Sequence, residues 1–212
     1  MTDKDSTSNL QEPIDQQIHE LEMKLYEQTL ALNELRKQAS ATEVPNYEFA
    51  TQAGHTTLLD LFADNDKLLV IHNMGEACRY CTLWGDGFNG LIDHLESAMS
   101  VVLVSKDDPA TQRKFANSRG WQFRLASHGG GKYIIEQSAQ QGSANMPGAV
   151  VYEREGDKIL RRGASVFGPG DLYSPMWNLL GLAGMTEADW TPQFRYWLPP
   201  KKLDDGGENV LG

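Results

Sequence analysis

The sequence is poor in cysteine and has no long apolar run. Two cysteines occur among 212 residues. No uninterrupted apolar stretch approaches the roughly 18 residues of a membrane span, and the first 20 residues are too polar for a signal peptide. We therefore expect a cytoplasmic protein. In a reducing compartment, two neighbouring cysteines indicate redox or metal chemistry rather than a structural disulfide.

Positive charge is also scarce. The chain has 19 Lys and Arg against 29 Asp and Glu, a formal net charge of -10 at pH 7. Phosphate backbones and anionic membranes bind concentrated basic patches, and Arg161-Arg162 and Lys201-Lys202 are too short to form one. We expect no nucleic-acid partner and no membrane partner. The composition, 40% hydrophobic and 23% charged, is typical of one globular domain with appendages.

The two cysteines lie three residues apart, just after an apolar stretch. Residues 68–71 read Leu-Leu-Val-Ile, and Cys78 and Cys81 follow within residues 75–84. This pattern predicts a strand that leads to a Cys-x-x-Cys pair at the start of a helix. The partial positive charge of a helix N-terminus stabilises a thiolate, which favours a reactive Cys78 and a disulfide closed by Cys81.

Three interpretations of the pair compete: a dithiol/disulfide centre, half of a zinc site, or two inert core thiols. Zinc needs about four ligands, and the sequence has no second Cys-x-x-Cys. His72, His94 or His128 would have to converge on the pair. The preceding strand and following helix favour the dithiol centre, so we expect no metal and no bound cofactor.

A helix with a narrow apolar stripe is predicted over residues 13–39, after a polar and disordered segment at residues 1–12. The apolar residues follow alternating steps of four and three, and Gln28 occupies one position of the stripe. The stripe consists of Ile14, Ile18, Leu21, Leu25, Leu32 and Leu35. Such a helix either pairs with a second copy, giving a homodimer, or packs on its own domain.

The remaining chain predicts an α/β domain over residues 45–185. Strand, helix, strand and helix follow in turn from residue 67 to Gly120, which implies parallel strands joined by crossovers. A hairpin over residues 149–162 and a helix from Ser174 to Leu182 complete it. We expect residues 186–212 to form a C-terminal arm, whose aromatic side chains either pack on the domain or on a partner subunit, or form a substrate-binding patch. These side chains are Trp190, Phe194, Tyr196 and Trp197.

This order of elements resembles the thioredoxin-like superfamily, a mixed sheet flanked by helices, here with an N-terminal helical extension and a C-terminal arm. In those proteins a cis proline lies against the active-site cysteines, and Met146-Pro147 stands at the matching place. The segments 81–88 and 173–177, with His72, more closely resemble an uncharacterised bacterial family of thioredoxin-like proteins. That family commonly carries Pro-Ser between its cysteines, where this chain has Arg79-Tyr80.

The resemblance implies a thiol-disulfide oxidoreductase acting on a protein or small-molecule disulfide. Cys78 would attack, as the more exposed thiol, and Cys81 would resolve the mixed disulfide. His72 stands six residues before Cys78, where thioredoxins have a proton-relaying carboxylate, and its pKa would suit proton transfer near neutral pH. The alternative for His72 is a core histidine bonded to backbone. The expected substrate-contacting residues are Arg79, Tyr80, Met146 and Pro147.

Two rival functions remain open. In a thiol peroxidase, Cys78 would be oxidised to a sulfenic acid and Cys81 would condense with it. In a non-enzymatic scaffold, the chain would keep the fold and dimerise through residues 14–35. Near the pair, Arg79 favours a thiolate at Cys78 and Glu76 opposes it. His128, followed by three glycines, lies either on a flap over the site or on a plain surface loop.

Overall fold

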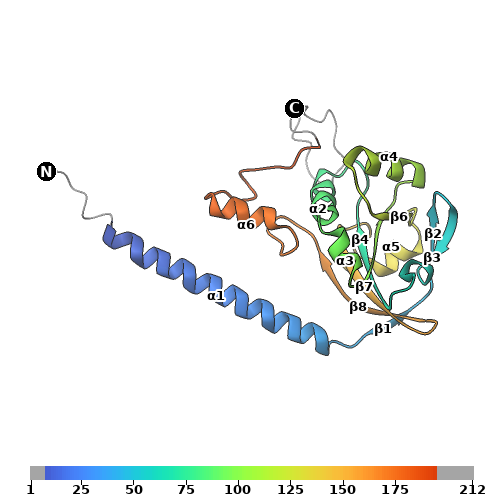
Figure 1. Cartoon of the computed structure of the whole chain (residues 1–212), viewed down its shortest axis with the longest axis horizontal. Coiled ribbons are helices and arrows are strands. Elements are labelled where there is room, and N and C mark those ends of the chain that lie inside the picture. Colours follow the sequence, from blue (N-terminus) through green and yellow to red (C-terminus); the bar gives the residue numbers. More distant parts are fainter. Residues whose placement is uncertain (1–7, 195–212) are drawn as a thin grey trace. The chain divides into compact units, whose positions relative to one another are not determined.

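The computed structural model describes residues 8–194, with side chains from residue 13 onward. The chain divides into two units, Met1–Ser40 and Ala41–Gly212. The first unit contains the helix α1 (Ser8–Gln38), drawn as one continuous rod in Figure 1. The helix thus begins at Ser8, within the segment 1–12 for which disorder was expected. Pro13 lies inside the helix, where it removes one backbone donor and its ring crowds the preceding turn. The long run of good helix formers that follows offsets this cost.

The apolar stripe of α1 is largely open to solvent. Ile14, Ile18 and Leu21 are each more than half exposed, as are Leu25 and Leu35. In proteins, a helix gains most of its stability by packing an apolar face against a neighbour. The stripe thus leaves an exposed apolar surface of the kind that pairing with a second helix covers.

The second unit is built on one eight-stranded sheet of order β1-β8-β7-β4-β5-β6-β2-β3. Strands β4, β5 and β6 are parallel, whereas β7 is antiparallel to β4 and to β8. The strands are β1 (Thr42–Val44), β2 (Glu48–Thr51), β3 (Gly54–Thr57), β4 (Lys67–His72), β5 (Ser100–Ser105), β6 (Arg124–Ser127), β7 (Gly148–Glu155) and β8 (Lys158–Val166).

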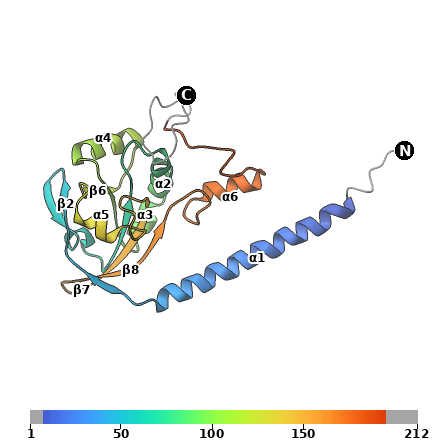
Figure 2. The ribbon, with the colours of Figure 1, turned by 180° about the vertical axis from the view of Figure 1, so that it is seen from behind.

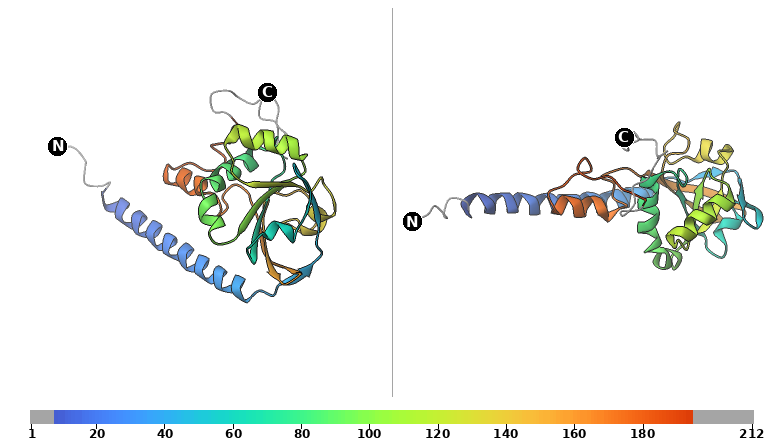
Figure 3. Two further views of the ribbon diagram at one scale, coloured as in Figure 1. Left: turned by 45° about the vertical axis from the view of Figure 1, so that its right-hand side comes forward. Right: turned by 90° about the horizontal axis from the view of Figure 1, so that it is seen from above.

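Helices cover both faces of this sheet, as Figures 2 and 3 show from further directions. The helical elements of the unit are η1 (Asp60–Phe62), α2 (Arg79–Asn89), α3 (Ile92–Glu96), α4 (Pro109–Arg119), α5 (Lys132–Gln137) and α6 (Pro175–Leu182). The parallel pair β4 and β5, the hairpin β7–β8 and the following α6 confirm the predicted thioredoxin-like mixed sheet flanked by helices.

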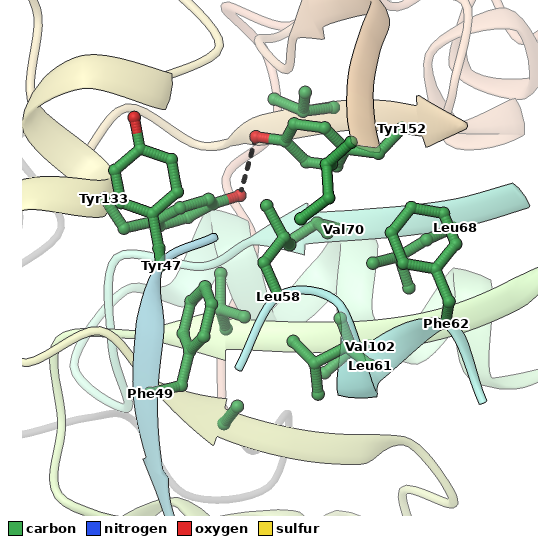
Figure 4. Packing of buried hydrophobic residues seen from close by; sticks show 14 of the residues in the cluster. Tyr47, Phe49, Leu58, Leu61, Phe62, Leu68, Val70, Val102, Tyr133 and Tyr152 are labelled. Atoms are coloured by element: carbon green, nitrogen blue, oxygen red, sulfur yellow. Dashed lines mark hydrogen bonds between the residues drawn. The ribbon is translucent and has the colours of Figure 1, made fainter. Parts of the chain in front are cut away.

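The two sheet faces bury separate apolar clusters because side chains alternate along each strand. Val70 of β4 belongs to a first cluster with Tyr133 of α5, much of which Figure 4 shows. Ile71, the next residue, belongs to a second cluster with Trp84 of α2 and Trp177 of α6. The cysteine helix α2 therefore packs on the face opposite to α5.

The described part of the C-terminal arm packs on the second cluster. The ring centroid of Trp190 lies 6.3 Å from that of Trp177, and that of Phe194 lies 6.4 Å from that of Phe115. Arg119 donates a hydrogen bond to the Phe194 carbonyl at 2.6 Å. Of the four aromatic residues expected in the arm, Tyr196 and Trp197 lie outside the described residues.

Candidate redox site

A disulfide joins Cys78 and Cys81 at the N-terminus of α2, with the Cα atoms 5.3 Å apart. Cys78 is the N-cap, and its Sγ accepts a hydrogen bond from the Cys81 amide at 3.1 Å. The Met74 amide donates to the Cys81 Sγ at 3.4 Å. The pair follows β4 after a loop of five residues. The strand, loop and helix predicted around the cysteines are thus present.

Both cysteines are buried, with 2% of Cys78 and 3% of Cys81 exposed. The expectation that Cys78 is the more open thiol is therefore wrong for the disulfide form. The Cys78 side chain turns back over the first turn of α2, where it bonds to Cys81, instead of pointing outward. Any reagent that opens this disulfide has to reach a sulfur beneath the surface.

The two residues between the cysteines differ in exposure. Arg79 is 3% exposed, and its guanidinium carbon lies 5.7 Å from the centroid of the Tyr80 ring. Tyr80 is half-buried and packs against the second cluster. Arg79 is therefore a buried side chain next to Cys78 in the sequence, whereas Tyr80 keeps part of its surface open to solvent.

The chain brings Met146-Pro147 to the end of β4. Gly148 pairs with His72 across β7 and β4, so the buried Pro147 lies one position beyond the strand that leads to the cysteines. Met146 is half-buried. Within residues 8–194 no peptide bond is cis, so the cis proline implied by the resemblance is wrong here. The trans form is the lower-energy state of an X-Pro bond, by about 0.5–1 kcal/mol.

His72 is bound to a tyrosine and to neither sulfur. Its Nε2 lies 2.8 Å from the hydroxyl of Tyr133, and its Nδ1 has no partner among the described residues. Strand alternation places His72 on the face of the first cluster with Val70, opposite to α2. The structure therefore does not bring His72 into contact with Cys81.

Burial lowers the pKa of His72 to about 3, with smaller contributions from His128 and Arg161. A desolvated imidazolium is costly, so the ring is neutral at neutral pH. The expectation that this imidazole titrates near neutral pH is wrong, because the sequence did not reveal how completely the ring is buried. The alternative, a core histidine bonded to backbone, is confirmed for the core position, since His72 is buried, but the hydrogen-bond partner is a side chain.

A buried polar network that the sequence analysis missed surrounds His72. Tyr152 donates to the Tyr133 hydroxyl at 3.3 Å, the bond dashed in Figure 4, which leaves the Tyr133 proton for His72 Nε2. Gln137 donates to the Tyr47 hydroxyl at 3.0 Å. Burial raises the pKa of both Tyr133 and Tyr152. Tyr133 and Gln137 lie four residues apart on α5, a spacing that indicates a shared helix face.

His128 is buried beside Tyr133 of this network and does not lie on an open loop. It is 7% exposed, its Nδ1 accepts a hydrogen bond from the Gly130 amide at 3.0 Å, and its ring centroid lies 6.4 Å from that of Tyr133. Burial lowers the pKa of His128 to about 4. The three following glycines are exposed. The histidine itself is thus part of the core.

The described residues offer neither a metal cluster nor a membrane-spanning helix. No three His, Cys, Asp or Glu side chains in that part of the chain lie together as metal ligands do. His94 is exposed on α3, so the convergence that a zinc site would require does not occur around the cysteines. Among the helices from residue 8 to residue 194, none combines the length and apolar character that crossing a bilayer requires.

Several solved peroxiredoxin structures are similar to this chain. Peroxidoxin BcpB from Mycobacterium tuberculosis is 19% identical, with a TM-score of 0.46 over 54% of this chain and 78% of that one. Reduced Prx3 from Vibrio vulnificus is 15% identical, with a TM-score of 0.47 over 68% and 98%. The bacterioferritin comigratory protein of Xanthomonas campestris is 20% identical, with a TM-score of 0.43 over 55% and 80%.

Sequence comparison assigns the family. No curated protein matches the chain. Residues 8–197, which are most of the chain, match the family model described as "Bacterial protein of unknown function (DUF899)". This match agrees with the resemblance to an uncharacterised bacterial family of thioredoxin-like fold, and the chain belongs to this DUF899 family of bacterial proteins.

Proposed function

We propose that this protein is a thiol-disulfide oxidoreductase in which Cys78 and Cys81 cycle between a dithiol and a disulfide. The observation that carries the proposal is the disulfide at the N-terminus of α2, directly after β4. A helix N-terminus and the buried charge of Arg79 both favour a thiolate at Cys78. Thiolate is the form of cysteine that attacks disulfides.

In the reducing direction, the Cys78 thiolate attacks one sulfur of a substrate disulfide. The substrate S–S bond breaks, a mixed disulfide forms on Cys78, and the first substrate thiolate leaves and takes up a proton. Cys81, once deprotonated, attacks the Cys78 sulfur, which releases the second substrate thiol and forms the protein disulfide. Two electrons pass to the substrate, and a thiol reductant returns the protein to the dithiol.

The burial of both sulfurs narrows the kind of substrate. A flat protein surface does not reach a sulfur that is 2% or 3% exposed. Small disulfides, or an extended segment that inserts an arm, are better suited. Tyr80, between the two cysteines, and Met146, two residues before the strand partner of His72, are both half-buried. They are the residues that we expect such a substrate to touch first.

A thiol peroxidase is the second candidate, and the same burial favours it, because a hydroperoxide is small. The Cys78 thiolate would attack the terminal peroxide oxygen, which breaks the O–O bond and releases an alcohol or water. The resulting sulfenic acid would condense with the Cys81 thiol, forming the disulfide and releasing water. The two candidates share the disulfide product and differ in the oxidant.

The test is a comparison of oxidants on the pre-reduced full-length protein. Disulfide formation is followed by mass spectrometry during reaction with small disulfides and, separately, with hydrogen peroxide and an organic hydroperoxide. Faster oxidation by disulfides, through a mixed disulfide of the expected mass, supports the oxidoreductase. A sulfenic acid trapped on Cys78 and faster peroxide reaction favour the peroxidase. If neither kind of oxidant reacts faster with the protein than with free dithiothreitol, both proposals are wrong, and a scaffold role replaces them.

The redox potential of the pair provides an independent test. The protein is equilibrated with a series of reduced and oxidised glutathione buffers, and free thiols are alkylated and counted. A couple that titrates within the range of known redox proteins, about -270 to -120 mV, is poised for exchange. A disulfide that stays closed throughout the series has a structural role.

A further inference from the structure

A small cavity with one apolar and one polar wall, the apolar wall being the larger, lies beside the loop that leads to the cysteines. Its volume is about 10 Å³, room for one water-sized group. Its apolar wall includes Leu103 and Trp121, which belong to the second cluster together with Trp84 of α2. The cavity is thus on the same face of the sheet as the cysteine helix. Its polar wall consists of Asn73, Glu76, Ser105, Asp107 and Gln112.

The cavity and the cysteine loop share a wall. The Asp107 carboxylate accepts a hydrogen bond from the Glu76 amide at 2.6 Å. Gly75 has a φ of +122°, and a Cβ there would lie 2.8 Å from both carboxylate oxygens of Asp107. The Cys78 amide donates to the Gly75 carbonyl at 3.1 Å. The Asp107 carboxylate therefore lies against the backbone segment to which Cys78 is bonded.

One of the buried polar side chains of this cavity, Gln112, presents an acceptor without a donor. Gln112 is 6% exposed, and its Nε2 already donates to Ser105 Oγ at 2.8 Å and to the carbonyl of Asp107 at 3.0 Å. Its Oε1 is buried and has no partner among the described residues. A buried acceptor without a donor is costly, so the geometry favours a ligand that donates hydrogen bonds here.

The two carboxylates add negative charge to this acceptor. In the described part of the chain, neither Glu76 nor Asp107 forms an ion pair. Glu76 is exposed at the rim, and Asp107 is half-buried. A water molecule would satisfy the acceptor but not the charge. A group that matches both has the size of water, several N–H donors and a positive charge.

We infer that this cavity binds the primary ammonium group of a small aminothiol or of its disulfide, and so sets the substrate preference of the cysteine pair. An ammonium has three donors, enough for Gln112 Oε1 and the carboxylates of Asp107 and Glu76. Glu76 on the cavity wall stands two residues before Cys78, so we expect a short carbon arm to connect the ammonium to the sulfur that reacts there. The inference rests on the proposed oxidoreductase function.

Cystamine illustrates the reaction. The Cys78 thiolate attacks one cystamine sulfur, one cysteamine leaves as a thiolate and is protonated, and the other stays on Cys78 as a mixed disulfide with its ammonium in the cavity. The Cys81 thiolate then attacks Cys78, which releases the second cysteamine and closes the protein disulfide. Two electrons pass from the protein to cystamine, so the pre-reduced protein needs no further reductant.

The experiment compares three small disulfides that differ in charge: cationic cystamine, neutral 2-hydroxyethyl disulfide and anionic dithiodiglycolate. The pre-reduced full-length protein reacts once with each, and each rate is divided by that of dithiothreitol with the same disulfide. We expect cystamine to be preferred over the neutral disulfide by about tenfold, the effect of one charge-assisted hydrogen bond, and the anionic disulfide to be slowest. Added salt should reduce the preference.

Matched variants locate the preference. Asp107→Asn should bring the ratio of cystamine to neutral disulfide close to one. Asp108→Asn is the control. Asp108 is an exposed helix cap whose carboxylate accepts hydrogen bonds from the amides of Ala110 and Thr111, and asparagine caps a helix equally well. The ratio of rates for this variant should equal that of the wild type. If Asp107→Asn does not fold, Glu76→Gln at the exposed rim should still lower the ratio by about half.

The outcomes separate the two proposals. Equal normalised rates for all three disulfides with the wild-type protein overturn the ammonium site and leave the oxidoreductase function standing. The same holds if Asp108→Asn lowers the ratio as much as Asp107→Asn does. Absence of reaction with all three disulfides overturns the oxidoreductase function, and the substrate inference with it.

Discussion

The indole ring of Trp121 occupies the space where a side chain at Gly85 would lie. A Cβ at Gly85 would be 2.7 Å from Cη2 of that ring. Trp121 also donates from Nε1 to Asp86 Oδ1 at 2.8 Å. The glycine in the cysteine helix thus permits α2 to approach the segment that follows α4, and it explains why a residue of low helix propensity stands there.

We predict that Gly85→Ala destabilises the protein by about 1–3 kcal/mol, because the added methyl group collides with a well-packed ring. Gly87 provides the control, since it lies on the same helix with nothing within 4 Å of the added Cβ. Gly87→Ala should raise stability by about 0.5–1 kcal/mol through helix propensity. Urea unfolding of both variants measures the difference, and equal effects would contradict the close approach.

The second prediction concerns the cysteines. Cys81→Ser should accumulate a mixed disulfide on Cys78 when it meets a small disulfide, because attack remains and the resolving sulfur is missing. Cys78→Ser should form no mixed disulfide at position 78 and should no longer reduce the substrate disulfide. Mass spectrometry under non-reducing conditions identifies the labelled cysteine. An adduct confined to Cys81 in the Cys78→Ser variant, with faster formation than on Cys78, would reverse the assigned roles.

The third prediction concerns the two buried histidines. In the unfolded chain their pKa is near 6.5, and burial lowers it to about 3 for His72 and about 4 for His128. Below pH 6.5 the unfolded state binds protons that the folded state excludes. The free energy of unfolding should therefore be highest above pH 6.5. It should fall as the pH decreases toward 4, by up to about 1.4 kcal/mol per pH unit for each histidine.

Chemical unfolding at a series of pH values measures this slope. His72→Gln should flatten it, whereas His55→Gln, at an exposed histidine of β3, should leave it unchanged. Because His72 bonds Tyr133 and neither sulfur, we also expect the pH profile of disulfide exchange above pH 7 to be the same in His72→Gln. Slower resolution by Cys81 in that variant would instead support the proton relay first considered from the sequence.

The fourth prediction concerns α1. Its exposed stripe has the heptad spacing of a two-stranded coiled coil, and a polar residue such as Gln28 within the stripe helps to define the register of a pair. We predict that the full-length protein self-associates through this helix. Leu25→Glu, on the stripe, should reduce the mass measured by light scattering. Met23→Glu, at an exposed position off the stripe, should not, and equal masses for the two variants would make α1 an extension without this role.

Local sequence pattern determined much of this fold. The apolar run before the cysteines, the Cys-x-x-Cys spacing, and the Asp108 cap and left-handed Gly120 that bound α4 all act within a few residues. The hairpin β7–β8 turns at Gly156, which has a positive φ, a conformation that glycine adopts without strain. The short helix α5 was not predicted, because its six residues carry too little periodicity to distinguish it from a loop.

The properties of the site were decided by contacts between residues far apart in the chain. His72 meets Tyr133 across 61 positions, which removes the ring from water and lowers its pKa. Asp107 reaches Glu76 across 31 positions and places a carboxylate beside the cysteine loop. Local preference selects strands, turns and helices over a few residues, whereas burial, and with it reactivity and charge, depends on which distant segments pack together.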